Sequence, residues 1–188
     1  MEKTDDQLIT EYLGGEETAF ALLVTRHLKR VYNFAYRLSD NAEDAEDIAQ
    51  ETFLKAWRNL KKYQHGRSFK AWLFRIAHNT AIDLLRKKKE YMLSSFENEE
   101  GENPLLDNLM DPEPLPDQLV ERAEDKKLVD SLLDKLSPLY REVLLLRYND
   151  HFTFEEIGEA LGKSIHTVKS QHRRALIILH KLLVESSY

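Results

Sequence analysis

Residues 153–176 read TFEEIGEALGKSIHTVKSQHRRAL, a stretch that has the pattern of a helix-turn-helix. Thr153 and Glu156 have the spacing of a capping box, which predicts where a first helix begins. Gly162 suits the left-handed residue that follows this helix, and Ser164 can cap a second one. So tight a turn leaves the second helix free to enter a DNA major groove.

The second predicted helix carries apolar and cationic side chains on different faces. Its apolar stripe, at helical spacing, consists of Val168, Ala175, Leu179 and Leu182. The i,i+4 pairs on its other faces are Lys169 with Arg173 and Ser170 with Arg174. Because such groups pair with phosphate oxygens and with N7 and O6 of guanine, these faces are typical of DNA binding.

Composition limits the classes of protein to which this chain can belong. Its 188 residues, 42% of them hydrophobic, can bury the core of one large domain or of two small ones. The absence of cysteine excludes disulfides, cysteine nucleophiles and thiolate metal sites. No apolar run has the length of a membrane span, and the acidic N-terminus is unlike a signal peptide, so we expect a soluble cytoplasmic protein.

The net charge of −6 is unevenly distributed along the chain. Residues 92–120 contain eight carboxylates and no Lys or Arg, a local charge of −8, which leaves −6 minus −8, or +2, for the rest. From residue 161 onward, five cations face only Glu185, a local charge of 5 minus 1, or +4. The basic charge therefore lies where the predicted DNA-binding helix needs it.

The acidic stretch also contains four of the five prolines, at 104, 112, 114 and 116, which disfavour regular structure. Its simplest interpretation is a solvated, solubilising tether. The sequence therefore predicts an all-α protein of two small helical domains, 1–91 and 121–188, joined by an acidic, proline-containing linker at 92–120.

The first domain is predicted to contain four helices. Thr4 and Gln7 form a capping box for the first, and Gly14 and Gly15 end it. The second is amphipathic, is broken at 39–41, and carries the apolar residues Phe20, Leu23, Val24, Leu28, Val31, Phe34 and Leu38.

The third helix is predicted over about 42–60, and the fourth from its N-cap Ser68 to about 86–89. Apolar residues at helical spacing place Trp57 and Trp72 in the core rather than in base stacking.

Carboxylates are concentrated at the start of the third predicted helix. Asp47, Gln50 and Glu51 lie outside its apolar stripe and present hydrogen-bond acceptors to a basic partner. A metal site here is disfavoured, because no His stands at ligand spacing and because carboxylates at a helix N-terminus are favoured by the dipole anyway.

The fourth predicted helix carries a polar stripe of Arg75, Asn79 and Arg86, preceded by a basic loop with Tyr63 and His65. Cations beside polar and aromatic groups suit a single-stranded backbone and its unstacked bases. The alternative is that the basic helix end only complements the helix dipole.

Four stretches in order resemble the motifs of the extracytoplasmic-function (ECF) sigma factors, the small branch of the sigma-70 family of bacterial RNA polymerase. They are DAEDIAQETFLKAW at 44–57, FKAWLFRIAHN at 69–79, LSPLYREVLLLRY at 136–148, and the helix-turn-helix. The resemblance covers nearly everything except the linker. It implies two helical domains, regions 2 and 4, that bind core polymerase at the β′ clamp and the β flap and recognise the −10 and −35 promoter elements.

The resemblance also assigns roles to residues of this chain, with no catalytic residue, metal or cofactor of its own and with an anti-sigma factor as a further partner. The residues it implies for docking on the β′ clamp are Asp47, Gln50 and Glu51. Those implied for the −10 element are Tyr63, His65, Arg67, Arg75, Asn79 and Arg86. Those implied for the −35 element are His166, Thr167, Lys169, Ser170, Gln171, Arg173 and Arg174.

The chain departs from the family pattern at Gln171, His172 and Arg173, so its −35 preference cannot be copied from relatives. His172 lies on the apolar stripe of the second helix, which favours a packed imidazole over base reading.

Two other classes of protein share part of this pattern. A regulator that binds duplex DNA without polymerase would account for the helix-turn-helix. It would not account for the row of hydrogen-bond acceptors at Asp47, Gln50 and Glu51, or for the surface predicted to bind single-stranded DNA. A metal-dependent nuclease built on the acidic helix would cleave DNA with Mg²⁺ and would lose that activity on Asp47→Ala.

Overall fold

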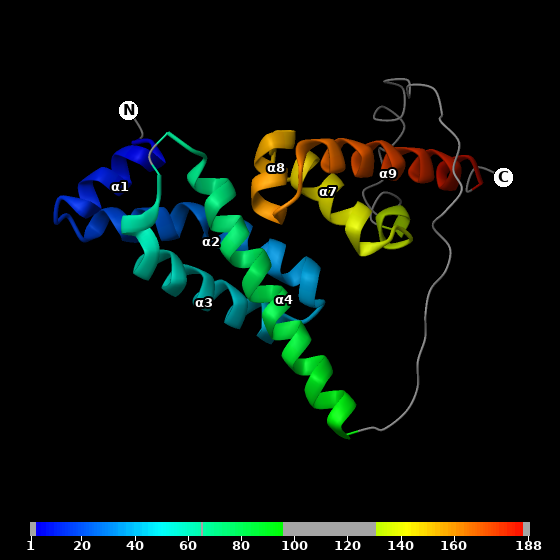
Figure 1. Ribbon diagram of the computed structural model, residues 1–188, viewed down its shortest axis with the longest axis horizontal. Coiled ribbons are helices and arrows are strands. Elements are labelled where there is room, and N and C mark those ends of the chain that lie inside the picture. The colour runs from blue at the N-terminus through cyan, green and yellow to red at the C-terminus, as the bar shows by residue number, and fades with distance from the viewer. Residues whose placement is uncertain (1–2, 65, 96–130, 186–188) are drawn as a thin grey trace. The chain divides into compact units, whose positions relative to one another are not determined.

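The computed structural model describes residues 3–64, 66–95 and 131–185, and the side chains in these ranges except those of 89–95. Each element in these ranges is a helix, as the all-α prediction requires (Figure 1). The elements are α1 (Asp5–Leu13), α2 (Thr18–Ser39), α3 (Ala42–Asn59), the 3₁₀ turn η1 (Leu60–Lys62), α4 (Phe69–Ser95), α7 (Pro138–Tyr148), α8 (Phe154–Leu161) and α9 (Ile165–Glu185). None of the described helices is long and apolar enough to cross a membrane.

Contacts divide the chain into two compact units. One is built on α1 to α4 and takes in residues 155–164, and the other is built on α7 and α9. Most of the predicted linker, from residue 96 onward, lies outside the described residues, so the division at 1–91, 92–120 and 121–188 stays a prediction.

Local side-chain chemistry sets where the first helices begin and end. At the start of α1, the Thr4 hydroxyl accepts a hydrogen bond from the Gln7 amide (3.3 Å), and Oε1 of Gln7 accepts one from the Thr4 amide (2.8 Å). Gly15, with φ +105°, reverses the chain after α1. The predicted break after α2 is also confirmed: Asp40 is left-handed at φ 52°, and Oδ1 of Asn41 caps α3.

The core of the N-terminal unit lies where α2, α3 and α4 pack against one another (Figure 1). At its centre the rings of Phe34 and Phe74 are 5.0 Å apart. Each fully buried large apolar side chain contributes about 1.5–3 kcal/mol. The largest such side chains from α1 to α4 are Leu8, Ile9, Leu23, Val31, Phe34, Ile48, Leu60, Leu73 and Phe74.

Two predicted core residues lie on the surface instead. Leu28 is 46% exposed, because the buried stripe of α2 runs through Leu23, His27 and Val31, and Leu28 lies one helical position beyond it. Trp57 is 49% exposed for the same geometric reason, since its neighbour Ala56 takes the inward position on α3.

The predicted end of the fourth helix, near 86–89, was also wrong, because α4 continues to Ser95. The three lysines at 87–89 were interpreted as a C-terminal signal. Residues 87–95 contain no Gly or Pro, so nothing in the local sequence stops the helix there.

In the second unit, α7 packs against α9. Pro138 stands in the first turn of α7, where its missing N–H costs nothing. The buried cluster between the two helices consists of Leu136, Tyr140, Leu144 and Ala175. The predicted apolar stripe of α9 is confirmed: Val168 and Ala175 are fully buried, and Leu179 packs on the cluster.

Candidate nucleic-acid and protein interfaces

The turn between α8 and α9 has the predicted geometry at its glycine. Gly162 is left-handed, with φ +66°, and the Lys163 amide donates to the carbonyl of Gly158 at 2.9 Å. The caps predicted at Thr153 and Ser164 stay predictions. A side chain at 162 would strain this turn, so the glycine fixes the short connection into α9.

Most of the residues predicted for −35 contact are exposed on the first three turns of α9. The exposed ones are His166, Thr167, Lys169, Ser170, Arg173 and Arg174. Gln171 is half-buried, and its Oε1 is fully buried with no hydrogen-bond partner among the described residues. Gln171 is therefore less accessible to DNA than its neighbours on the helix.

His172 is packed, as its position on the apolar stripe predicts. Its ring meets that of Phe154 edge-on at 5.1 Å, and its Nε2 lies 3.1 Å from the Tyr148 hydroxyl. Burial, together with the charge of Arg147, lowers the pKa of His172. The imidazole therefore stays neutral at neutral pH, which suits a packing role better than a phosphate contact.

Phe154 also contacts two cations, beside the residues predicted for −35 contact. The Arg147 guanidinium lies 4.8 Å from the centre of its ring, and Nζ of Lys169 lies 5.9 Å from it. Arg147 in addition donates to the carbonyl of Phe152 at 2.7 Å. Lys169 therefore has a contact within the protein, which the sequence did not reveal.

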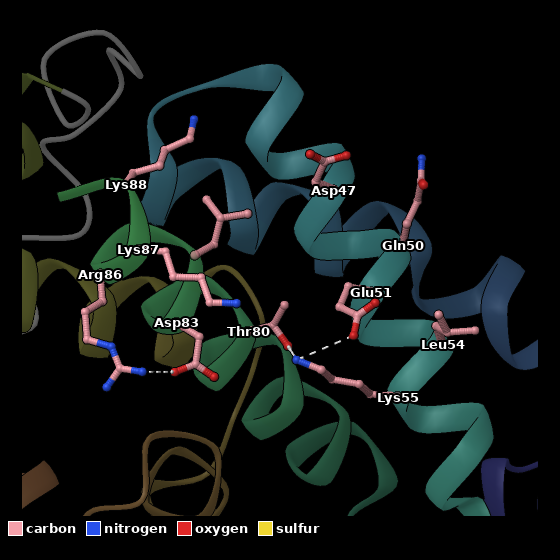
Figure 2. Close-up of a pocket in the computed structure, with 11 residues that line it drawn as sticks. Asp47, Gln50, Glu51, Leu54, Lys55, Thr80, Asp83, Arg86, Lys87 and Lys88 are labelled. Carbon is pink, nitrogen blue, oxygen red and sulfur yellow. Dashed lines mark hydrogen bonds and ion pairs between the residues drawn. The ribbon is translucent and has the colours of Figure 1, made fainter. Parts of the chain in front are cut away.

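In the N-terminal unit, a groove of about 820 Å³ runs between α3 and α4. Asp47 and Gln50 are exposed along the α3 side, and Glu51 is half-buried beside them. Figure 2 shows these side chains on α3 and the cationic Arg86, Lys87 and Lys88 on α4. The α3 wall thus carries three hydrogen-bond acceptors beside Lys55, and the α4 wall carries three cations beside Asp83.

Ion pairs within the groove are weak, apart from one that is partly buried. Lys55 lies 3.7 Å from Glu51 and donates to the Thr80 hydroxyl at 3.1 Å (Figure 2). Such exposed pairs contribute about 0–1 kcal/mol, so Glu51 can change partners at low cost. Asp44, in contrast, is buried and paired with Lys88, which ties α3 to α4.

The predicted polar stripe of α4 is exposed. Arg75, Asn79 and Arg86 all face solvent, with Arg86 3.3 Å from Asp83. Ile82, which the sequence analysis missed, lies on the same face and is 46% exposed. Its spacing in the sequence could have identified it, because Ile82 follows Arg75 by seven positions and therefore lies on the same face of the helix as the polar stripe.

The loop before α4 behaves differently from its prediction. Arg67 is exposed, and His65 lies outside the described residues. Tyr63 is only 6% exposed, so in this structure it is a core residue rather than a surface that DNA can reach. Its ring packs at 5.6 Å against both Phe69 and Trp72. Trp72, which was predicted to lie in the core, is partly buried.

The Tyr63 hydroxyl is held by two oxygens, Oδ1 of Asp6 at 3.0 Å and the backbone carbonyl of Arg67. Burial and the neighbouring Asp6 carboxylate raise the pKa of Tyr63, so the phenol stays protonated and can donate. Ser68 then begins α4, accepting a hydrogen bond from the Ala71 amide at 3.2 Å. The prediction of Ser68 as N-cap is confirmed.

The chain is similar to known proteins over both units. Residues 23–91 match the family model of Sigma-70 region 2, and residues 126–179 match that of Sigma-70 region 4. The ECF RNA polymerase sigma factor SigW of Bacillus subtilis is 34% identical over 185 residues, which is 97% of this chain and 98% of that protein.

Two solved structures are similar in fold along most of the chain. CnrH, a sigma factor of Cupriavidus metallidurans solved with the cytosolic domain of CnrY, has a TM-score of 0.66 and 28% identity, covering 96% of this chain and 97% of that one. The sigma factor RpoE of Bartonella quintana, solved with the anti-sigma factor NepR, has a TM-score of 0.64 and 28% identity, covering 87% and 96%.

Proposed function

The chain belongs to the sigma-70 family of RNA polymerase sigma factors, in the ECF branch, and from this premise we propose how its surfaces divide promoter recognition. As a sigma factor it binds core RNA polymerase and directs promoter-specific transcription initiation. The proposal concerns which residues carry each step.

Core polymerase docks on the outer face of α3. Asp47 and Gln50 are exposed, Glu51 forms a weak surface pair with Lys55, and the opposite face of the helix is anchored in the core by Ile48 and Phe53. A rigid row of acceptors of this kind is complementary to a basic helix of the β′ clamp, and its charge favours rapid association. Docking on the β flap belongs to the C-terminal unit.

The −10 element is opened against the exposed face of α4. Arg75, Asn79 and Arg86 hold the backbone and base edges of the displaced strand, and Ile82 supplies an apolar surface between them. Arg67 extends this surface into the loop before α4. Tyr63, which the structure buries, supports the loop and does not contact DNA in this proposal.

The −35 element is read by the N-terminal half of α9. Its exposed side chains include the long cationic donors Lys169, Arg173 and Arg174, on a helix whose other face is fixed by Val168 and Ala175. The residues proposed to contact DNA are His166, Thr167, Lys169, Ser170, Arg173 and Arg174, with Gln171 at the edge.

The chain contributes binding free energy and no chemical step of its own. Trapping bases that have left the stack lowers the cost of strand separation, while the polymerase performs phosphoryl transfer. We place the protein in the cytoplasm, where polymerase acts. Since the structural relative RpoE was solved with the anti-sigma factor NepR, we include an anti-sigma factor among the partners of this chain.

The observation that carries the proposal is that one compact unit exposes both an acceptor row on α3 and a cationic stripe on α4. A run-off transcription assay tests it, with purified core polymerase in the presence and absence of the chain. Promoter-dependent RNA that requires the chain is expected. Duplex binding by the chain alone, with no effect on polymerase, would instead identify a polymerase-independent regulator.

A further inference from the structure

Helix α1 precedes the stretch that matches sigma-70 region 2, yet two of its carboxylates reach into that region. Asp5 and Asp6 are adjacent in the first turn of α1 and point to different partners. Asp5 binds α2, whereas Asp6 binds the Tyr63 hydroxyl, 57 residues away in the chain. The two contacts make α1 a brace between α2 and the loop before α4.

The Asp5 contacts fix α1 in place. Its two carboxylate oxygens lie 2.6 Å from the Arg26 guanidinium and 2.8 Å from Nε2 of His27. Burial would raise the pKa of Asp5, but the hydrogen bonds and charges of His27 and Arg26 outweigh it and lower that pKa. Arg26 also donates to the carbonyl of Lys3 at 2.7 Å, so the start of α1 is held at several points.

The Asp6 contact acts on a different segment. The phenol of Tyr63 has one proton, which it shares between Oδ1 of Asp6 and the carbonyl of Arg67. The ring itself cannot move freely, because Phe69 and Trp72 pack against it. The hydroxyl therefore connects α1 to the backbone at Arg67, one residue before the cap of α4.

The backbone at Arg67 needs this support because it is not in a regular element. It follows Gly66, whose φ is +85°, and the Arg67 amide makes only a long 3.3 Å hydrogen bond to the carbonyl of Gln64. The Arg67 side chain is exposed and extends the α4 stripe. A shift of its backbone would therefore move a cation relative to Arg75.

We propose that Tyr63 is a positioning residue for the −10 surface: its hydroxyl fixes the backbone of Arg67, and because the Asp6 carboxylate competes for the same proton, α1 tunes promoter opening without touching DNA. The proposal rests on the assignment of α4 and Arg67 to the −10 element. It predicts that Asp6 and Tyr63 act as one unit, so that their substitutions are not additive.

The first experiment needs only the full chain. Hydrogen exchange at the Arg67 amide is measured for wild type, Asp6→Ala, Tyr63→Phe and Asp6→Asn. Faster exchange is expected in Tyr63→Phe, slower exchange in Asp6→Ala because the phenol then donates to the Arg67 carbonyl alone, and wild-type exchange in Asp6→Asn, which keeps an acceptor oxygen. Equal exchange in Asp6→Ala and wild type would overturn the positioning link, whatever the chain does with polymerase.

The second experiment uses holoenzyme assembled from core polymerase and each full-length variant. Open complexes are measured by permanganate reactivity across variants of the −10 element, beside affinity for core and for −35 duplex. Tyr63→Phe is expected to reduce opening about two- to tenfold, the loss of one hydrogen bond, and Asp6→Ala to raise it by no more than that, with core and −35 binding unchanged. The double variant is expected to match Tyr63→Phe, and Asp6→Asn to match wild type.

Glu11→Ala is the matched control, because Glu11 is another α1 carboxylate, paired with Lys3 at 2.7 Å on the surface. It is expected to open promoters like wild type. An effect of Glu11→Ala equal to that of Asp6→Ala, additive effects in the double variant, or a fall in core binding together with melting temperature would overturn the proposal and reduce α1 to a stabilising helix. If wild-type holoenzyme opens no promoter, the −10 assignment fails while the exchange experiment still decides the link.

Discussion

Replacing Arg174 by alanine removes a guanidinium that makes no hydrogen bond or ion pair with any residue in the described parts of the chain. The side chain is exposed on α9, and its neighbour Ala175 supplies the buried contact on the opposite face. Because no internal contact is lost and alanine favours helix, the melting temperature of Arg174→Ala is expected to stay within a degree or so of wild type. The effect then falls on DNA binding alone.

The size of that effect follows from the geometry of a base contact. A bidentate contact from arginine to O6 and N7 of guanine discriminates against a wrong base by about 1–3 kcal/mol. At about 1.4 kcal/mol for each factor of ten, affinity for the preferred −35 sequence falls by roughly 5- to 150-fold. At one −35 position, all four bases then become nearly equivalent.

Lys169→Ala provides the contrast on the same helix. Its ammonium lies 5.9 Å from the Phe154 ring, so its loss also removes a cation–π contact worth about 0.5–1 kcal/mol at an exposed site. We expect a uniform loss across −35 sequences and a salt slope smaller by roughly 1, as for a phosphate contact. Lys181→Ala, the loss of an exposed charge later on α9, is the matched control.

The assay is binding of holoenzyme to a library of −35 variants at several salt concentrations, beside melting curves of the isolated chain. A uniform loss in Arg174→Ala with unchanged base preference would refute the reasoning, because it would make Arg174 a phosphate contact. Unfolding of the variant would refute it differently, by showing that Arg174 stabilises the helix. Equal effects of Lys181→Ala would show that only net charge matters.

Three further predictions concern other parts of the protein. Asp47→Arg is expected to weaken core binding at least tenfold in a titration with core polymerase, with an unchanged melting curve and with Glu185→Arg as the control for charge. Because folding lowers the pKa of His172 below its ordinary value of 6.5, the protein is most stable, as far as this group is concerned, at pH values above 6.5. That stability is lost as the pH falls from 6.5 through the pKa of the folded state. His172→Phe is therefore expected to make the melting temperature less dependent on pH in this range. Glutamine at 97, 99, 100 and 102 is expected to alter the ratio of abortive to full-length RNA while core binding persists, whereas an unchanged ratio would make the linker a passive spacer.

The parts of the fold that the sequence predicted are those fixed by local chemistry. The capping box of Thr4 and Gln7, the cap at Ser68 and the left-handed Gly162 each depend on residues within a few positions of one another. Their interactions can be recognised without knowing the rest of the structure. The exposure of most residues predicted for docking and for −35 contact was predictable for a similar reason, because polar residues at helical spacing outside an apolar stripe face solvent.

The errors arose where a distant residue decides the outcome. His27 is buried and Leu28 is exposed, although leucine is the more apolar, because Asp5 of α1 supplies a partner for the imidazole. The alternative orientation of α2 would bury Leu28 but leave that carboxylate without its partner. Hydrophobic periodicity along α2 does not contain this information, because one helical position changes the facing direction by only about 100°.

Tyr63 shows most clearly how distant residues decide burial, and its burial changes how we explain the surface proposed to bind the −10 element. A tyrosine in a basic loop suggests stacking on a base, but Asp6, Phe69 and Trp72 enclose it. Arg75 is fixed in position because it lies within α4, whereas Arg67 precedes that helix and depends on the hydrogen bond from Tyr63 to its carbonyl. Ordering a flexible side chain at an interface costs about 0.5–1.5 kcal/mol. A loop that is already ordered before DNA binds avoids such a cost, so more of the binding free energy is available for strand opening. Residues that never contact DNA, among them Asp6, therefore help to set how readily this protein opens a promoter.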